Sequence, residues 1–365
     1  MKEQAHKCLG LDPGSLSWKA AVLDDHGLIW TGKVATEDVC RDPDIMKSLV
    51  YEHRDGLQAI AAPSGFGLPL VPIDRIGKRE LSLMTLKRDG PGIVGVARAI
   101  EVLKAVQRDI GAKCFVLPSV KHLTTVPVRR KINRVDLGTT DKLCAAAHAL
   151  QKLVEKQSAS YEDISFVLGE IGSSFVGMVC VKRGKVVDGI GGTNASFGVG
   201  ASGALDAELA HIWHFPDKAS LYSGGLADAA GMPLGQIEES LSGTLPPRAR
   251  HAFARFVESV TCDASAMASR NGVETFVLSS VLGPKMNEAI EDSLKRVGLK
   301  VVKGINDEMS ASIGAAFLVN GLIGGRYRRL SETLAIAKAR GSIMDHIFYR
   351  GTPALPHVGE TCALD

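Results

Sequence analysis

Short apolar runs separated by polar turns open the chain. Val, Leu, Ile and Ala fill the runs, and Gly, Ser, Asp and His fill the turns between them. Apolar runs bounded by turn residues are typical of β-strands, whereas apolar positions repeated every three or four residues are typical of helices. The pattern predicts, in order, strands at 7–12, 18–24 and 28–36, a helix near 42–53, a strand at 57–63, a helix near 91–110, a strand at 113–119 and a helix that opens at 138–141.

The same order of elements then begins again. The segment 163–190 is predicted to be strand, Gly/Ser turn, strand, Arg183-Gly184 turn and strand, and it is similar to 7–36 in length and in the positions of its turns. Strands and helices then alternate at 274–285, 299–304 and 307–325. The chain is therefore predicted to contain two copies of one βββαβαβα unit, each opened by a hairpin with a Gly/Ser tip.

A chain of 365 residues is long enough for two domains, because single cores stop growing at roughly 250 to 300 residues. We expect an N-terminal domain at 1–137 and a C-terminal domain at 138–365, with a mostly helical insertion at about 195–272. The two hairpin tips would then face a shared cleft. Two unrelated α/β domains are the alternative.

Composition and charge narrow the class of partner. The net charge is only +3, and the basic residues are scattered except at Arg129, Arg130, Lys131 and Arg134, so no nucleic-acid surface is expected. The seven cysteines form no CxxC pair, which favours a reducing compartment over a disulfide framework or a zinc site. No apolar run approaches the ~18 residues that span a bilayer, and the start MKEQAHK does not resemble a secretory signal. A cytoplasmic protein without a membrane partner is expected.

The duplicated unit with paired hairpins resembles the superfamily of acetate kinases, sugar kinases, actin and the large heat-shock chaperones. Within it, Asp12-Pro13-Gly14-Ser15-Leu16-Ser17-Trp18-Lys19 is similar to the Asn-Pro-Gly-Ser-x-Ser-x-Lys of acyl-phosphate-forming kinases, especially butyrate kinase. LGEIGSSFVGMVCVKRGKVVD resembles their second hairpin, and GINDEMSASIGAAFLVNG resembles their last helix. PSGFGLPL and DLGTTDKLCAAAHAL are also similar to an archaeal and bacterial family of unknown function whose members are described as predicted butyrate kinases.

The resemblance implies an α/β fold of two actin-like (ribonuclease H-like) domains with a nucleotide cleft between them. It further implies a phosphotransferase that uses ATP and Mg²⁺ and acts on a small metabolite, with a short-chain carboxylate as the first choice of acceptor. A kinase of a hydroxylated metabolite and a non-catalytic nucleotide-binding switch remain alternatives. The expected partner is a small-molecule substrate, and a homodimer is compatible with the sequence.

The nucleotide would lie on the two tips. A Gly/Ser turn presents unobstructed backbone N–H groups to phosphates, as other anion-binding nests do. One such turn is weak evidence for phosphate binding. A second Gly/Ser turn at the matching place in the second copy strengthens that evidence. The expected nucleotide-binding residues are Gly14, Ser15 and Ser17, then Gly172, Ser173 and Ser174, and, at the turn that carries adenosine in the superfamily, Ser279, Ser280 and Gly283.

Carboxylates and a lysine complete the expected nucleotide site. Asp12 would hold a water of the nucleotide-bound Mg²⁺, and Lys19 would neutralise the negative charge of the phosphates. Glu308 falls on the family's acidic metal position, although it could instead complement the dipole of the last helix. Glu170 and Ile171 replace the glycines of the family's second tip, which we place at 169–174, and this puts its phosphate contact in question.

The acceptor side is expected at the loop Ser64-Gly65-Phe66-Gly67, unless that loop merely turns the chain. Asp141 resembles the catalytic Asp of sugar kinases, where an alcohol acceptor needs a base, although it could be only a first-turn acid.

The acceptor loop of the second unit departs from the family most. Acetate and butyrate kinases carry an Arg before a Ser-Gly where this chain has Ala201-Ser202-Gly203. Either Arg129, Arg130 or Arg134 replaces that Arg in space, or the acceptor differs and contacts Ser202, Asp206 and Glu208. The expected catalytic residues are therefore Asp141, Lys19 and Arg129.

Overall fold

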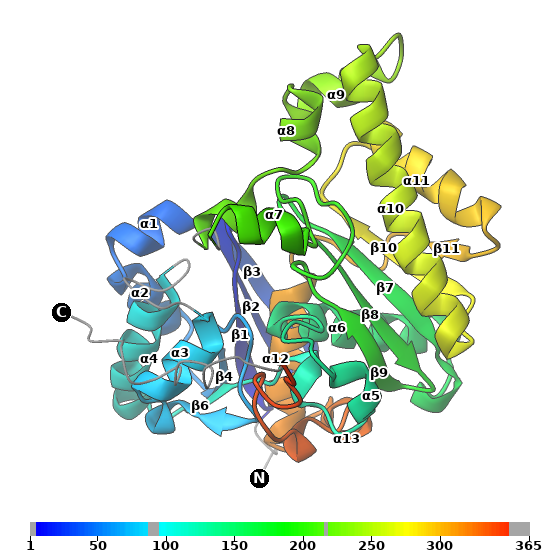
Figure 1. Cartoon of the computed structure of the whole chain (residues 1–365). Coiled ribbons are helices and arrows are strands. Elements are labelled where there is room, and N and C mark those ends of the chain that lie inside the picture. Colours follow the sequence, from blue (N-terminus) through cyan, green and yellow to red (C-terminus); the bar gives the residue numbers. More distant parts are fainter. Residues whose placement is uncertain (1–4, 87–94, 215–217, 350–365) are drawn as a thin grey trace.

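Two β-sheets stand side by side in the computed structural model, which describes residues 5–86, 95–214 and 218–349 (Figure 1). Within these residues the first sheet has the order β3-β2-β1-β4-β6-β5. The first three strands pair antiparallel, and β1, β4 and β6 pair parallel. The strands are β1 (Lys7–Pro13), β2 (Ser17–Asp24), β3 (Gly27–Ala35), β4 (Leu57–Ala62), β5 (Val71–Pro72) and β6 (Lys113–Val116).

The second sheet repeats the order of the first. Its strands run β11-β10-β7-β8-β9, which is β6-β4-β1-β2-β3 over again, with the same parallel and antiparallel pairings. They are β7 (Phe166–Ile171), β8 (Val176–Lys182), β9 (Lys185–Ile190), β10 (Thr275–Ser280) and β11 (Lys300–Val302). The predicted duplication is confirmed, and we call β1 to α6 the first unit and β7 to α12 the second unit.

Helices cover the outer faces of both sheets and fill the space between them (Figure 1). The segment between β9 and β10, expected to be mostly helical, carries α7 to α10. The helices are α1 (Thr36–Arg41), α2 (Asp44–Glu52), α3 (Lys78–Thr85), α4 (Val96–Ile110), α5 (Val128–Lys131), α6 (Thr140–Gln157), α7 (Ala207–Ile212), α8 (Leu226–Ala230), α9 (Leu234–Ser240), α10 (Pro247–Asn271), α11 (Pro284–Arg296), α12 (Ser310–Leu322) and α13 (Arg328–Thr333).

The last helix of each unit packs on the sheet of the other. Helix α6 ends the first unit and contacts β7 and β8, whereas α12 ends the second unit and contacts β1, β2 and β4. The two helices also pack on each other through small residues, so that a Cβ on Gly314 would lie 1.9 Å from the carbonyl oxygen of Cys144. Every residue of α12 from Ser310 to Gly321 is buried, as a helix enclosed on all sides requires.

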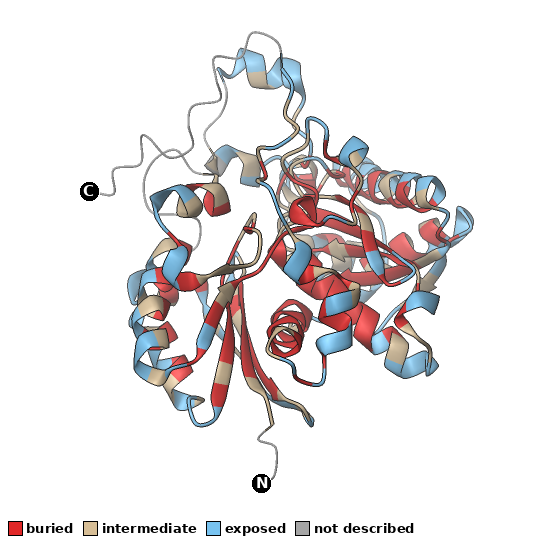
Figure 2. Cartoon of the chain, turned by 90° about the horizontal axis from the view of Figure 1, so that it is seen from below, coloured by how far each residue is buried: buried red, intermediate tan, exposed pale blue. Residues whose placement is uncertain are grey.

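One hydrophobic core therefore joins the two units. It contains residues of both sheets together with α6 and α12, and two further clusters lie under the outer helices of each sheet. Buried residues concentrate on the strands and on the helices between the sheets (Figure 2). The domain boundary at 137 and 138 stays a prediction.

Several local expectations change. Helix α3 and strand β5 were not predicted, and β6 ends at Val116 rather than at 119. Helix α4 begins at Val96, and residues 91–94 of the expected helix lie outside the described residues. The cysteines within the described ranges are free thiols, and Cys362 lies outside those ranges. No helix of the described part of the chain has both the length and the apolar character needed to cross a membrane.

Candidate active site between the two hairpins

The tips of the two hairpins meet between the sheets. The first hairpin is β1–β2 and the second is β7–β8, and the hydroxyl oxygens of Ser15 and Ser173 lie 3.4 Å apart. The second tip is shorter than predicted, because β7 runs to Ile171 and leaves Gly172 to Phe175 as the turn. Glu170 is therefore a strand residue. It lies two positions before Gly172, as Asp12 lies two positions before Gly14, so the two carboxylates occupy equivalent places.

The first tip is held by short backbone contacts. The N–H of Gly14 donates to the carbonyl of Asp12 at 3.2 Å, and the hydroxyl of Thr36 donates to the carbonyl of Gly14 at 2.7 Å. A Cβ on Gly14 would lie 2.5 Å from the carbonyl oxygen of Ser17, so the turn requires glycine. Lys19 lies opposite Asp12 on β2, with its Nζ 3.8 Å from the Asp12 carboxylate.

The second tip is supported from the segment that follows β9. The N–H of Gly172 donates to Phe175 at 3.0 Å, and the carbonyl of Ser174 accepts the N–H groups of Gly200 and Ala201, each at 3.0 Å. Ala201 is fully buried. The position where the resembling kinases carry Arg is thus a structural support of the second tip.

The expected acceptor loop lies against the start of α6. The N–H of Thr140 donates to the carbonyl of Gly65 at 3.0 Å, and the hydroxyl of Ser64 accepts the N–H of Gly67 at 3.1 Å. Gly67 has a φ of +72°, and a Cβ there would lie 2.6 Å from the amide nitrogen of Ser119. These contacts fix the loop 64–67 beside Asp141, the second residue of α6.

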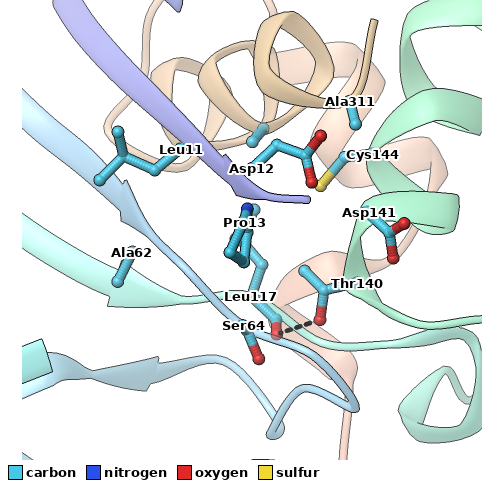
Figure 3. Close-up of a pocket in the computed structure, with 11 residues that line it drawn as sticks. Leu11, Asp12, Pro13, Ala62, Ser64, Leu117, Thr140, Asp141, Cys144 and Ala311 are labelled. Atoms are coloured by element: carbon cyan, nitrogen blue, oxygen red, sulfur yellow. Dashed lines mark hydrogen bonds between the residues drawn. The ribbon is translucent and has the colours of Figure 1, made fainter. Parts of the chain in front are cut away.

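Asp12 and Asp141 line one small cavity with Ser64, Thr140 and Cys144 (Figure 3). Its volume of about 10 Å³ is close to that of a single water. A phosphate chain does not fit into this cavity, whose lining includes Asp12 and Pro13 of the first hairpin but not Ser15 or Ser173.

A network of carboxylates and lysines extends from Asp141, at the cavity, to the second hairpin. Lys142 lies between Asp141 and Glu170, and its Nζ is 2.7 Å from a carboxylate oxygen of each. The hydroxyl of Thr139 donates to the other oxygen of Asp141. The second oxygen of Glu170, Oε2, is buried and has no hydrogen-bond partner among the described residues.

These contacts shift the pKa values of the three carboxylates in different directions. Burial, followed by repulsion from Asp141, raises the pKa of Asp12 to about 7. Burial also raises the pKa of Glu170, against the attraction of Lys142. Burial alone would raise the pKa of Asp141, but Lys142 and the hydrogen bonds from Lys142 and Thr139 lower it overall. Asp141 is therefore ionised at neutral pH.

The residues expected to hold adenosine follow β10. Ser279 and Ser280 pair with Glu170 and Ile171 of β7, which places the end of β10 directly beside the second hairpin. Gly283 caps α11, where a Cβ would lie 2.3 Å from the Glu238 side chain. The carboxylate of Glu238 accepts the N–H groups of the first turn of α11, at 2.8 and 3.0 Å.

Glu308 lies outside the charged network. It precedes α12, and its carboxylate pairs with Lys33 of β3 at 3.0 Å on a solvent-exposed surface. Lys33 is opposite Lys19, which is itself opposite Asp12, so the ion pair lies two strands away from Asp12. Glu308 as a metal ligand stays a prediction, and it would require this ion pair to break.

Three other expected residues have structural contacts or lie apart. The N–H of Ser202 donates to the carbonyl of Ser223 at 2.8 Å. The carboxylate of Asp206 caps α7, accepting N–H groups at 2.9 and 3.1 Å. Arg129 is exposed on α5. Their substrate and catalytic roles stay predictions.

The residues at the tips suit a magnesium nucleotide. They offer serine hydroxyls and two ammonium groups to phosphates, and the Asp12 carboxylate to Mg²⁺, which commonly takes one or two protein carboxylates and completes its shell with water and phosphate. No group of three His, Cys, Asp or Glu side chains in the described part of the chain is arranged to hold a metal ion by itself.

Sequence reasoning missed three side chains near this site. Lys142 was not singled out, although the acidic Glu170 within an apolar strand indicated that a cation must lie close. Lys218 reaches from the second unit to the first, where it donates to the carbonyl of Thr85 and lies 5.1 Å from the ring of Phe66. Tyr222 packs edge-on against Phe175 at 5.1 Å.

Comparison with known proteins identifies the fold. Residues 10–349 match a family model described as a protein of unknown function, DUF1464, and no curated protein matches the sequence. The structure is similar to an acetate kinase from Entamoeba histolytica (TM-score 0.61, 14% identity, 80% of this chain and 87% of that one). It is also similar to a propionate kinase from Francisella tularensis subsp. tularensis SCHU S4 (TM-score 0.61, 14% identity, 85% of this chain and 98% of that one). A ROK family protein from Streptococcus pneumoniae TIGR4 in complex with sucrose is a third (TM-score 0.51, 12% identity, 85% and 96%).

These similarities confirm the expected fold class. The chain is an α/β protein with two sheets and the actin-like ATPase fold shared by acetate kinases and ROK proteins. At such low identity the likeness establishes architecture, and the activity must be argued from the side chains.

Proposed function

The chain belongs to the DUF1464 family, and from its fold and its site we propose that it is an ATP- and Mg²⁺-dependent phosphotransferase acting on a small metabolite. The observation that carries the proposal is the meeting of the two hairpin tips at Ser15 and Ser173. Tips from both units converge on one point, where they would grip a phosphate chain from two sides and align it with an acceptor.

Each side chain has a distinct role in this proposal. Asp12 would hold the hydrated Mg²⁺, which when bound neutralises phosphate charge. Lys19, which lies beside Gly14, would bind the phosphates at the first tip, and the turns at Gly14 and Gly172 would present backbone N–H groups. Ser279 and Ser280 would approach the nucleoside from the end of β10.

The geometry favours a hydroxylated acceptor. Asp141 is ionised and fixed beside the loop 64–67, where a carboxylate can accept a proton from an alcohol. The Arg that stabilises charge in the resembling acyl-phosphate kinases is absent, and the fully buried Ala201 stands in its place.

A short-chain carboxylate is the second candidate. It is favoured by the sequence of the first tip, Asp12-Pro13-Gly14-Ser15-Leu16-Ser17-Trp18-Lys19, which is similar to that of butyrate kinase. A carboxylate acceptor is already ionised at neutral pH and needs no base, so Asp141 separates the two candidates.

The test combines nucleotide binding with turnover. Calorimetry measures binding of Mg·ATP, and ADP release is followed with a panel of short-chain acids, sugars and polyols. We expect Asp12→Ala to lose Mg²⁺-dependent binding. Asp141→Ala should keep binding but lose roughly 10² to 10⁴-fold of the turnover with a hydroxylated acceptor. Asp44→Ala, on the exposed surface of α2, is the matched control.

Two results would change the proposal. Turnover with butyrate or another acid that survives Asp141→Ala would select the carboxylate candidate. Tight ATP binding with no acceptor-stimulated turnover across the panel would leave the protein a nucleotide-binding switch and reject the phosphotransferase.

A further inference from the structure

The position that carries an arginine in the resembling acyl-phosphate kinases has no arginine in this chain. Ala201 occupies its place, is fully buried and donates its N–H to Ser174. A longer side chain has no room there without displacing the support of the second tip. If the protein transfers phosphate, as proposed above, the charge that develops must be met from elsewhere.

Of the arginines predicted as replacements, Arg130 already pairs with another carboxylate, and Arg129 is exposed on α5. Asp188 of β9 is fully buried, and its Oδ2 lies 3.3 Å from Nε of Arg130 and 2.7 Å from Nε of Arg270. Asn271 donates to the same oxygen at 3.0 Å. Taking Arg130 away would leave a buried carboxylate less well compensated, which is costly.

Opposite Glu170 the second hairpin has a glycine, and Lys142 of α6 supplies the cation at that place. On the first hairpin Asp12 faces Lys19, whereas on the second Glu170 faces Gly177. A Cβ on Gly177 would lie only 3.2 Å from Cε of Lys142, so the missing side chain leaves room for this lysine to reach Glu170 from α6. Lys142 thereby takes the place in the second unit that Lys19 takes in the first.

The surroundings keep Lys142 charged. Burial alone would lower the pKa of this lysine, but Asp141 and Glu170 raise it above its ordinary value. The ammonium group is thus a permanent cation beside Asp141 and the second tip.

We propose that Lys142 is the catalytic cation that binds the γ-phosphate during transfer, and that Glu170 is the positioning residue that holds its ammonium group until the phosphate takes over that contact. In the transfer, a bond forms between the acceptor oxygen and the γ-phosphorus while the bond from that phosphorus to the β,γ-bridging oxygen breaks. ADP keeps the electron pair of the broken bond, and a hydroxyl acceptor gives its proton to Asp141. Lys142 stays protonated throughout.

The test compares affinities for Mg·ATP and Mg·ADP, because only ATP carries the γ-phosphate. Calorimetry is applied to the full-length protein and to Lys142→Met, Lys142→Arg, Glu170→Gln and the double variant Lys142→Met/Glu170→Gln. Lys300→Met is the matched control. Lys300 lies on the edge strand β11, where it is exposed and forms an ion pair with Glu274.

We expect Lys142→Met to weaken ATP binding roughly tenfold more than ADP binding, and Lys142→Arg to restore most of the difference. Glu170→Gln should tighten ATP relative to ADP, and this gain should vanish in the double variant, because it acts through Lys142. Equal weakening of both nucleotides by Lys142→Met, or a Glu170→Gln effect that persists without Lys142, would overturn the assignment.

Two further outcomes are distinguishable. A parent protein that binds neither nucleotide rejects the proposed function itself. If Lys142→Met fails to fold, Lys142→Arg and Glu170→Gln still decide the matter, since an unchanged ratio of ATP to ADP affinity in Glu170→Gln overturns the assignment.

Discussion

The two hairpins have the same backbone arrangement and different electrostatics. Each has a carboxylate two residues before the glycine of its tip, Asp12 in one and Glu170 in the other. The first hairpin supplies a cation from its own second strand, at 3.8 Å, whereas the second takes one from α6, at 2.7 Å. Duplication thus preserved the scaffold that brings two tips together, while the charges at equivalent places came to depend on different elements.

This difference couples the second hairpin to the helix that connects the units. Lys142 and Asp141 are consecutive residues of α6, so a movement of Glu170 away from α6 breaks the ion pair of the second hairpin. The ion pair of the first hairpin lies within one hairpin and is retained in the same movement. The two units are thus joined at this point by an ion pair between α6 of the first unit and β7 of the second.

Locking the tips together should have the largest effect. In a background with the exposed Cys40 and Cys262 changed to Ser, the pair Ser15→Cys and Ser173→Cys places two thiols at the contact of the tips. In the proposed function the phosphate chain lies between the two tips, so the oxidised protein, whose tips can no longer separate, should lose roughly 100-fold or more of its ATP affinity. Calorimetry before and after reduction measures the loss and its recovery.

The single variant Ser15→Cys in the same background controls for the substitution itself. Unchanged ATP affinity in the fully oxidised double variant would mean that the nucleotide does not enter between the tips.

The second expected effect concerns α12, which, like α6, packs on the sheet of the other unit. A Cβ on Gly10 of β1 would lie 2.1 Å from the carbonyl oxygen of Ser312 and 2.6 Å from the amide nitrogen of Ala316, both backbone atoms of α12. The equivalent residue of the second unit is Leu168, which shows that α6 leaves room for a side chain where α12 does not. Gly10→Ala should lower the free energy of unfolding by about 3 kcal/mol, measured by urea denaturation.

Gly235→Ala is the matched control, because a Cβ at this exposed position of α9 meets no atom within 4 Å. It should stabilise the protein by about 0.5 to 1 kcal/mol. A similar loss in both variants would contradict the close packing of α12 on β1.

The third prediction uses the acidity of Asp12 in Mg²⁺-free buffer. Its pKa of about 7 in the folded protein lies above that of an unfolded Asp, so the folded state holds the proton more tightly. Its contribution to stability is fully present below the unfolded pKa and is lost as the pH rises toward 7. Asp12→Asn should therefore gain stability over the parent as the pH rises from 5 to 8, by at most about 1.4 kcal/mol per pH unit.

Unfolding free energies at intervals across this range measure the gap between the two proteins. At pH 8 Glu170→Gln should gain less stability over the parent than Asp12→Asn does. The reason is that Glu170→Gln loses a 2.7 Å ion pair with Lys142, whereas Asp12 has no ion pair this short. A gap that stays constant from pH 5 to 8 in Asp12→Asn would show that Asp12 does not titrate in this window.

Much of the scaffold could be predicted because its signals are local. The Gly/Ser turns recur at matching places in both units, and they predicted both hairpins and the duplicated sheets, although β7 extends into the second predicted tip. Asp12, Ser15, Ser173 and Asp141 come together because each lies at an end of a strand or helix that faces the space between the sheets. The exchange of α6 and α12 could not be predicted, because it depends on packing between residues far apart in the chain.

The charged centre of the site was predicted only in part for the same reason. A lysine in the first turn of a helix is ordinarily solvated, and Lys142 acquires its role only through Glu170, 28 residues further along the chain. The space it occupies is created by the absence of a side chain at Gly177. Neither feature forms a pattern in the sequence by itself.

The smallest expected effect decides the role of Glu308 before α12, the helix that ends the second unit as α6 ends the first. Its ion pair with Lys33 is about half exposed, with side-chain exposures of 51% and 58%, and such pairs contribute about 0.5 kcal/mol or less. Glu308→Gln should therefore change the unfolding free energy by no more than that amount, and calorimetry should find the Mg²⁺ dependence of ATP binding unchanged. Lys33→Met, which removes the same ion pair from β3, should behave alike. A loss of Mg²⁺ dependence in Glu308→Gln but not in Lys33→Met would place Glu308 on the metal and give the second unit a ligand equivalent to Asp12.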